Sequence, residues 1–263
     1  MQNVALTSVD GLQLEAAVHT ASSGTSLGTV IQAHGINANM TEGGMFVRLA
    51  DGLADAGFNV LRFSFRGHGK SGGTQRGATI AGELLDLQAA VEYADQRFPG
   101  PRSIVASSFG AVATSLSLPW LEGNLIRLAL WNPVLDLRRT FLKPELPWGK
   151  ENFSAEQQRL LATQGFLLLD GEFEMGRVLF EEFGHYQPLD YLVASGVPAL
   201  VVHGDRDSAV SYEIAQEAAA TRPNTDFHTV RGSDHGFDTR DRENEAVTVT
   251  IEWLLGGEER AWT

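Results

Sequence analysis

Residues 103–112 have the sequence Ser-Ile-Val-Ala-Ser-Ser-Phe-Gly-Ala-Val, which predicts a short buried strand, a tight turn and the start of a helix. The apolar run breaks at Ser108 and resumes after Gly110 with small residues. Such a strand-to-helix turn pushes one hydroxyl out above the edge of a sheet. Ser108 is therefore a candidate nucleophile, and the structural alternative is a helix N-cap, a common role for serine.

The composition fits one domain with a sizeable core and at most a small insertion. The 263 residues are 43% hydrophobic, carry a formal net charge of −13 and include no cysteine. The charge disfavours nucleic acid or an anionic membrane as a partner. The lack of cysteine excludes a disulfide framework and a thiolate nucleophile. Neither a leader pattern nor a long apolar window is present, so we expect a cytoplasmic protein.

Strand and helix patterns alternate along the chain. An Asp-Gly pair at 10–11 predicts a hairpin between residues 3–8 and 12–18. Besides the strand in 103–112, further strands are predicted at 29–33, 60–65, 128–131, 199–202 and 226–230. Helical spacing of apolar residues predicts helices at 44–56, from Thr79 to before Pro99, at 211–221 and around 247–254. This alternation indicates an α/β fold with a mainly parallel, twisted sheet flanked by helices.

One long connection interrupts this pattern. Residues 136–190 show no clean strand alternation and are rich in aromatic residues, glycine and proline. Connections of this length in a compact domain are usually functional insertions. We predict a core of residues 1–135 and 191–263 with a cap at 136–190. Its aromatic residues Phe141, Trp148 and Phe166 are candidates for a substrate pocket or for the cap's own small core.

Four His-Gly dipeptides lie near predicted strand ends. His34, His68 and His203 directly follow strands, and His235 lies in the loop after the last strand. Open α/β sheets bind ligands beyond the carboxyl ends of their strands. We therefore expect these four loops to share one rim with Ser108.

The parts needed for acyl transfer can all be placed at that rim. The reaction needs a hydroxyl, an imidazole, a carboxylate that orients it and two N–H donors for the oxyanion. Ser108 would attack, His235 would act as general base and then acid, and Asp207 would orient His235. The backbone N–H groups of Ile36 and Phe109 would form the oxyanion hole.

Five segments of the chain resemble motifs of the α/β-hydrolase superfamily. They occur in the order that the superfamily shows, with the nucleophile first, then the acid and then the histidine. They are His-Gly-Ile at 34–36, Arg-Gly-His-Gly-Lys-Ser at 66–71, Ala-Ser-Ser-Phe-Gly at 106–110, His-Gly-Asp-Arg-Asp at 203–207 and Gly-Ser-Asp-His-Gly at 232–236. Within the superfamily the chain is most similar to compact serine esterases, either cinnamoyl/feruloyl-esterase-like or monoacylglycerol-lipase-like. One departure is Ala106, where the family usually has glycine; alanine is the smallest replacement.

The resemblance implies a serine hydrolase that cleaves small-molecule carboxylic esters through an acyl-enzyme, as a monomer or homodimer, with no metal and no cofactor. An acyl thioesterase of a biosynthetic pathway and a peptidase or amidase would use the same triad. A non-catalytic receptor on the same fold would not need it. These alternatives remain open from the sequence.

Other residues compete for the same roles. If Ser107 were the nucleophile, Gly110 would be out of register with the motif. Asp205 and Asp234 are alternatives for the acid, but Asp207 stands where the family has it. His228 lies within a strand pattern that points it to the face opposite Phe227. His34, also a pocket candidate, and His68 could instead fix their loops by bonding backbone. The absence of a His-Glu-x-x-His sequence and of cysteine argues against a metal site.

Overall fold

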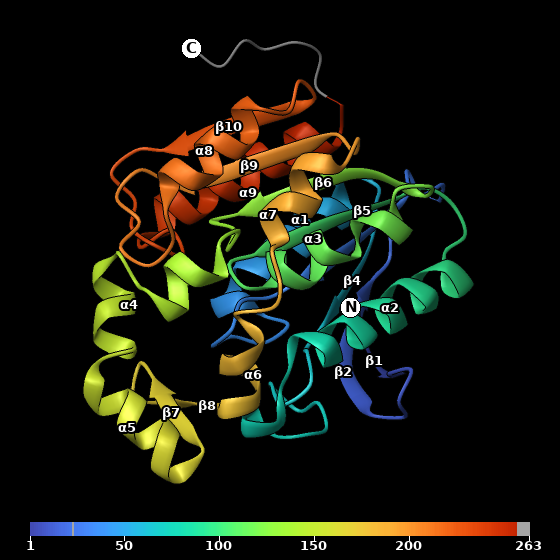
Figure 1. The fold of residues 1–263 in the computed structure, drawn as a ribbon. Coiled ribbons are helices and arrows are strands. Elements are labelled where there is room, and N and C mark those ends of the chain that lie inside the picture. The colour runs from blue at the N-terminus through green and yellow to red at the C-terminus, as the bar shows by residue number, and fades with distance from the viewer. Residues whose placement is uncertain (23, 257–263) are drawn as a thin grey trace.

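The computed structural model describes residues 1–22 and 24–256. Its centre is an eight-stranded sheet in the order β1-β2-β4-β3-β5-β6-β9-β10 (Figure 1). The strands are β1 (Gln2–Thr7), β2 (Gln13–His19), β3 (Thr29–Ala33), β4 (Asn59–Phe63), β5 (Arg102–Ser107), β6 (Leu125–Trp131), β9 (Ala199–Gly204) and β10 (Thr225–Val230). The pairs β1–β2 and β2–β4 are antiparallel, and the other neighbours are parallel. The predicted α/β fold with a mainly parallel sheet and an N-terminal hairpin is confirmed.

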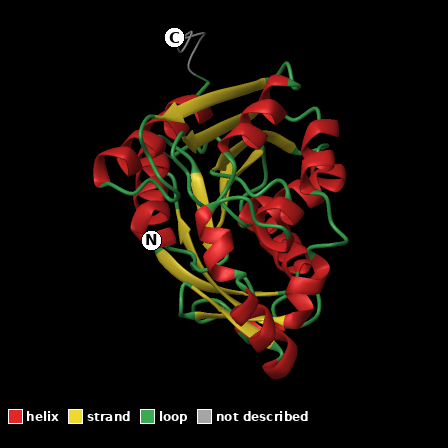
Figure 2. Ribbon diagram, turned by 60° about the vertical axis from the view of Figure 1, so that its left-hand side comes forward, coloured by secondary structure: helices red, strands yellow, loops and turns green. Residues whose placement is uncertain are grey.

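Helices cover both faces of the sheet (Figure 2). They are α1 (Met45–Asp55), α2 (Ile80–Arg97), α3 (Gly110–Leu121), α7 (Pro188–Ala194), α8 (Tyr212–Ala220) and α9 (Arg240–Leu254). Successive strand residues point to opposite faces, so β5 sends Ile104 and Ala106 into a core with α2, α3, α7 and α8. Val105 points into the second core, with α1 and α9. Since both faces are covered, every residue of β3, β4, β5 and β9 is buried.

Between β6 and α7 the chain forms a lobe beside the sheet, at the lower left of Figure 1. Its elements are a π-helical turn (Arg138–Leu142), α4 (Pro147–Asn152), α5 (Ala155–Gln164), β7 (Phe166–Leu169), β8 (Phe173–Gly176) and α6 (Arg177–Glu182). The antiparallel β7–β8 pair is a hairpin that the sequence did not predict. Aromatic residues of the lobe, Phe141 and Phe183 among them, share an apolar cluster with Phe109 and Val112 of the core, and the rings of Phe141 and Phe183 stack with centroids 4.3 Å apart. The lobe therefore packs directly on the turn that holds Ser108.

Within the described residues, no helix combines the length and hydrophobicity needed to cross a bilayer.

Candidate active site

The strand order places Ser108 where the chain changes direction across the sheet. After β3 the chain crosses to β4 on one side, and after β5 it crosses to β6 on the other. The loops after β3 and β5 diverge from this point, which is where open α/β sheets form a crevice. Ser108 occupies the turn between β5 and α3, with a φ of 48°. This left-handed conformation is uncommon for a non-glycine residue and is typical of a nucleophile elbow.

Gly110 is the residue that makes the turn sterically feasible. A Cβ at this position would lie 2.4 Å from the carbonyl oxygen of Ala33 and 2.6 Å from that of His34. Both are backbone atoms at the end of β3, so a side chain here would push the elbow away from the neighbouring loop. Ala106 meets no such obstacle, because its methyl group is fully buried in the core beneath α2 and α3. The departure from glycine at 106 is thus absorbed by packing.

Gly110→Ala is expected to lower the free energy of unfolding by about 1–3 kcal/mol, the usual cost of overpacking. Urea denaturation would measure it. Gly123→Ala is the matched control, because a Cβ there has nothing within 4 Å. Equal stability of the two variants would contradict this account of the turn.

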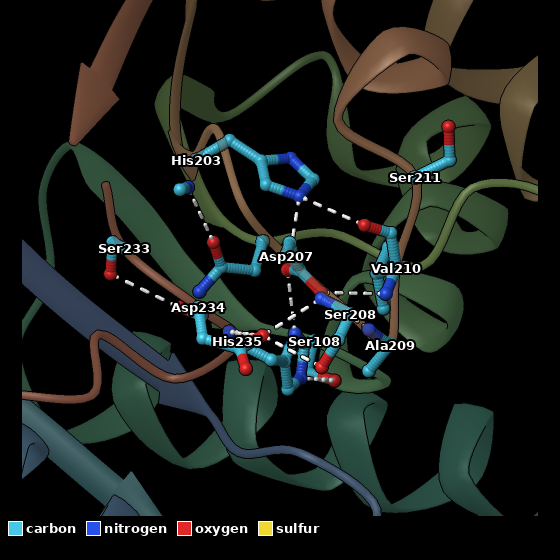
Figure 3. Close-up of polar contacts among 12 residues, drawn as sticks. Ser108, His203, Asp207, Ser208, Ala209, Val210, Ser211, Ser233, Asp234 and His235 are labelled. Carbon is cyan, nitrogen blue, oxygen red and sulfur yellow. Dashed lines mark hydrogen bonds and ion pairs between the residues drawn. The ribbon is translucent and has the colours of Figure 1, made fainter. Parts of the chain in front are cut away.

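A continuous hydrogen-bonded chain links three of the predicted residues (Figure 3). The Ser108 Oγ lies 3.0 Å from Nε2 of His235, and the Nδ1 of His235 lies 2.8 Å from Oδ2 of Asp207. Since an ionised carboxylate only accepts hydrogen bonds, Nδ1 carries the proton and Nε2 of the neutral ring is left to accept from the serine hydroxyl. The structure brings together residues 108, 207 and 235 from three separate loops.

Asp207 is held rigidly and kept ionised. Its Oδ1 accepts the N–H groups of Ala209 and Val210 at 2.9 and 2.7 Å. Its Oδ2 accepts Nε2 of His203 at 3.1 Å in addition to His235. Burial favours the neutral acid, but the charge of His235 and the hydrogen bonds from both imidazoles outweigh it and hold the pKa of Asp207 well below its usual range.

The neighbours of His235 stabilise its charged form more than water stabilises that of an ordinary histidine. Burial alone would lower its pKa, but the charge and hydrogen bond of Asp207, with smaller contributions from Glu42 and Asp234, raise that pKa above the ordinary value of 6.5. A ring stabilised in this way can take a proton from a hydroxyl and hold it during a reaction.

The predicted oxyanion donors lie on either side of Ser108. Phe109 follows it directly, and Ile36 belongs to the loop after β3. That loop is pressed against the serine, because a Cβ at Gly35 would lie 3.2 Å from the Cβ of Ser108. Among the described residues, no acceptor is recorded for the N–H of Ile36 or of Phe109. Both groups are available to a ligand oxygen.

A cavity of about 250 Å³ opens beside Ser108 and His235. Its wall includes the predicted pocket residues Phe141 and Trp148, together with the carboxyl groups of Glu42 and Asp170. Among the described residues the wall contains no lysine or arginine. The cavity is therefore a mainly apolar space with two acidic groups.

Two predicted pocket residues lie off this wall. His34 is buried: its Nε2 accepts the N–H of Phe65 at 2.9 Å, and its Nδ1 bonds the Gly35 carbonyl at 2.7 Å. Phe166 stacks under the guanidinium of Arg76, 3.7 Å from its ring centroid. His34 thus has the alternative role given above, in which it fixes its loop by hydrogen bonds to the backbone. Phe166 packs on the outside of the lobe.

The competing residues have other partners. Asp205 accepts the N–H of Gly232, and His228 pairs with Glu245 of α9 at 2.8 Å. Asp234 has a supporting role that the sequence did not reveal. Its Oδ1 accepts the N–H groups of Ser208 and His235, both at 2.7 Å, and so ties together the loops of Asp207 and His235.

A mostly parallel sheet with a serine in a strained strand-to-helix turn at its switch point defines an α/β-hydrolase. The chain belongs to the Hydrolase_4 family, whose model, described as "Serine aminopeptidase, S33", matches residues 24–165. The match includes the loop after β3 and the serine turn. It ends before β9, so Asp207 and His235 lie beyond it.

Individual relatives are distant. YfhR of Escherichia coli K12, itself described as uncharacterized, is 25% identical over 221 residues, covering 82% of this chain and 66% of YfhR. The chain therefore spans just under two thirds of that relative. The non-heme chloroperoxidase CPO-A1 of Kitasatospora aureofaciens is 25% identical over 216 residues, covering 70% of this chain and 78% of CPO-A1.

Solved structures share the whole fold. Est1E from Butyrivibrio proteoclasticus, determined with ferulic acid bound, has a TM-score of 0.81 at 22% identity, covering 95% of this chain and 98% of Est1E. The Pyrococcus furiosus esterase Pf2001 has a TM-score of 0.73 at 23% identity, covering 96% of this chain and 90% of Pf2001. These similarities establish the α/β-hydrolase fold for this chain.

Proposed function

We propose that the protein is a serine hydrolase that cleaves carboxylic esters of small molecules through an acyl-enzyme on Ser108. The observation that carries this proposal is the hydrogen-bonded chain from Asp207 through His235 to Ser108 at the wall of a cavity. Membership of a hydrolase family supports it.

The first half-reaction follows from the protonation states described above. As the Ser108 oxygen attacks the acyl carbon, its proton passes to Nε2 of His235, and the imidazolium is stabilised by Asp207. The N–H groups of Ile36 and Phe109 donate to the negative oxygen of the tetrahedral intermediate. When the intermediate collapses, the bond to the alcohol breaks and His235 returns the proton to the departing oxygen.

Water completes the cycle by the same route. His235 takes a proton from a water molecule that attacks the acyl-serine, and the second tetrahedral intermediate releases the carboxylic acid as His235 reprotonates Ser108. One histidine therefore serves as base and acid in turn. The rigid Asp207 and the loop tie through Asp234 keep it aligned in both steps.

The cavity wall favours an ester over a thioester of a phosphate-bearing carrier, because the described residues that line it include two carboxyls and neither lysine nor arginine. Cationic side chains are the usual partners of phosphate groups. The Pyrococcus furiosus esterase Pf2001, which shares the fold, supports an ester substrate.

A fluorophosphonate probe and a panel of matched substrates would test the proposal. The probe is expected to label Ser108 once per chain, seen by intact mass and peptide mapping. Butyryl p-nitrophenyl ester, butyryl thioester and butyryl p-nitroanilide share one acyl group, and the ester is expected to give the highest kcat/KM. Folded protein that resists the probe would contradict a serine hydrolase, and faster anilide cleavage would favour a peptidase or amidase.

A further inference from the structure

Glu42 is a carboxyl in the cavity wall that the proposed reaction does not use. It lies in the turn after the β3 loop, where residues 42–44 form a short 3₁₀ turn before α1. Its backbone φ is 45°, followed by 61° at Gly43 and 95° at Gly44. A left-handed glutamate persists only where its surroundings enforce it, and such residues cluster at functional sites.

The carboxyl is fixed against the loop that carries the oxyanion donor. Its Oε2 accepts the N–H of Gly35 at 2.8 Å, and Ser107 lies on the same cavity wall as the carboxyl. A Cβ at Gly35 would lie 3.5 Å from Oε1 of Glu42 and 3.7 Å from Oγ of Ser108. The carboxyl, the loop and the nucleophile therefore converge on Gly35.

The contact with Gly35 holds the backbone directly before Ile36. Once the Gly35 N–H is bound to Glu42, the following peptide leaves the N–H of Ile36 without a recorded acceptor among the described residues. The other side of Ile36 is also held, because its carbonyl accepts Nε2 of His68 at 2.7 Å. Glu42 and His68 thus clamp the donor residue from both sides.

The carboxyl also acts on the histidine through its charge. Burial raises the pKa of Glu42 to about 7, against the opposing effects of the Gly35 N–H, the charge of His235 and the Ser107 hydroxyl. In return, the charge of Glu42 adds to those of Asp207 and Asp234 in raising the pKa of His235. Glu42 and His235 line the same cavity, so whenever Glu42 is ionised it is a second carboxylate that favours the imidazolium.

We propose that Glu42 is a positioning residue for the ester hydrolysis: its carboxyl orients the Gly35–Ile36 loop so that the Ile36 N–H faces the oxyanion, and its negative charge stabilises the His235 imidazolium. The inference rests on the function proposed above. It assigns two separable effects to one side chain, hydrogen bonding and charge.

Two variants separate these effects. Glu42→Gln keeps an oxygen for the Gly35 N–H but removes the charge, whereas Glu42→Ala removes both. Glu42→Ala is expected to lower kcat by about 100-fold with KM changed less than about threefold, because a misplaced donor weakens the transition state. Glu42→Gln is expected to retain kcat within about tenfold of wild type, the scale of one modest interaction.

The pH profile of kcat/KM reports the charge effect. Its acid limb follows protonation of His235 in the free enzyme. Because Glu42→Gln removes a charge that raises the pKa of His235, the acid limb should move to lower pH. Glu252→Gln, an exposed carboxylate on α9, is the matched control and should leave the limb where it is in the wild type.

Folded Glu42→Ala protein with wild-type kcat would overturn the positioning role, and an unmoved acid limb in Glu42→Gln would overturn the charge role. If Glu42→Ala does not fold, Glu42→Gln tests both roles. A kcat reduced by much more than tenfold would overturn the hydrogen-bonding account, and an unmoved acid limb would overturn the charge role. Fluorophosphonate labelling keeps the two proposals apart. Wild-type protein that resists the probe refutes the proposed function. If the wild type is labelled normally and the Glu42 variants keep the kcat and acid limb of the wild type, only the role of Glu42 is refuted.

Discussion

Ser108→Ala is expected to lower kcat for an ester by roughly a million-fold, the loss seen when a nucleophilic serine of this kind is removed. Within the part of the chain that the structure describes, the hydroxyl has one recorded hydrogen bond, to His235 at 3.0 Å, so the fold should survive its removal. Ester assays with purified protein, accompanied by circular dichroism and a thermal melt, would measure both effects.

Ser107→Ala is the companion variant, because Ser107 is the alternative nucleophile in the same turn. Ser107 shares the cavity wall with Glu42, and losing one modest polar interaction there costs about tenfold in rate or less. An inactive Ser107→Ala beside an active Ser108→Ala would reverse the assignment.

Asp207→Asn is expected to lower kcat by about 10⁴-fold. The new amide oxygen can still accept from the N–H groups of Ala209 and Val210, but its NH₂ group would then face His235 and His203. To pair with that NH₂, His235 must place its own proton on Nε2, where it can no longer accept the proton of Ser108. Steady-state kinetics would measure the loss.

Asp205→Asn provides the matched control, two residues away. Asp205 accepts the N–H of Gly232 and has no recorded hydrogen bond to His235 among the described residues, so activity within about threefold of wild type is expected. A comparable loss in Asp207→Asn and Asp205→Asn would show that Asp207 is not the specific partner of His235.

In wild-type protein kcat/KM should fall as the pH drops through the pKa of His235, which lies above 6.5.

The regular parts of the fold could be predicted because their patterns are local. The Asp-Gly pair at 10–11 predicts the first hairpin, and runs such as 29–33 predict buried parallel strands. The β7–β8 hairpin was missed because Phe166–Leu169 is apolar at all four positions, so its alternate burial leaves no trace in the sequence.

The site was predictable where it depends on motif order and not where it depends on contacts between loops. Ser108, Asp207 and His235 follow strand ends in an order that the superfamily shares. Asp234 and Glu42 act through backbone N–H groups of loops whose approach is decided by the fold. The Glu-Gly-Gly sequence at 42–44 indicates a tight turn, but it does not say where the carboxyl points.

The apolar cluster between the lobe and the core limits how the substrate range of the proposed hydrolase can change. The cluster includes Ile36 and Phe109, whose N–H groups face the proposed oxyanion, and Phe141 and Phe183 of the lobe. The ring of Phe109 meets those of Phe141 and Phe183 edge-on at 5.7 and 6.0 Å. Substitutions in the lobe that reshape the cavity therefore also change the packing beneath the two donors. Substrate range and turnover share one set of contacts, so selection on either property acts on both.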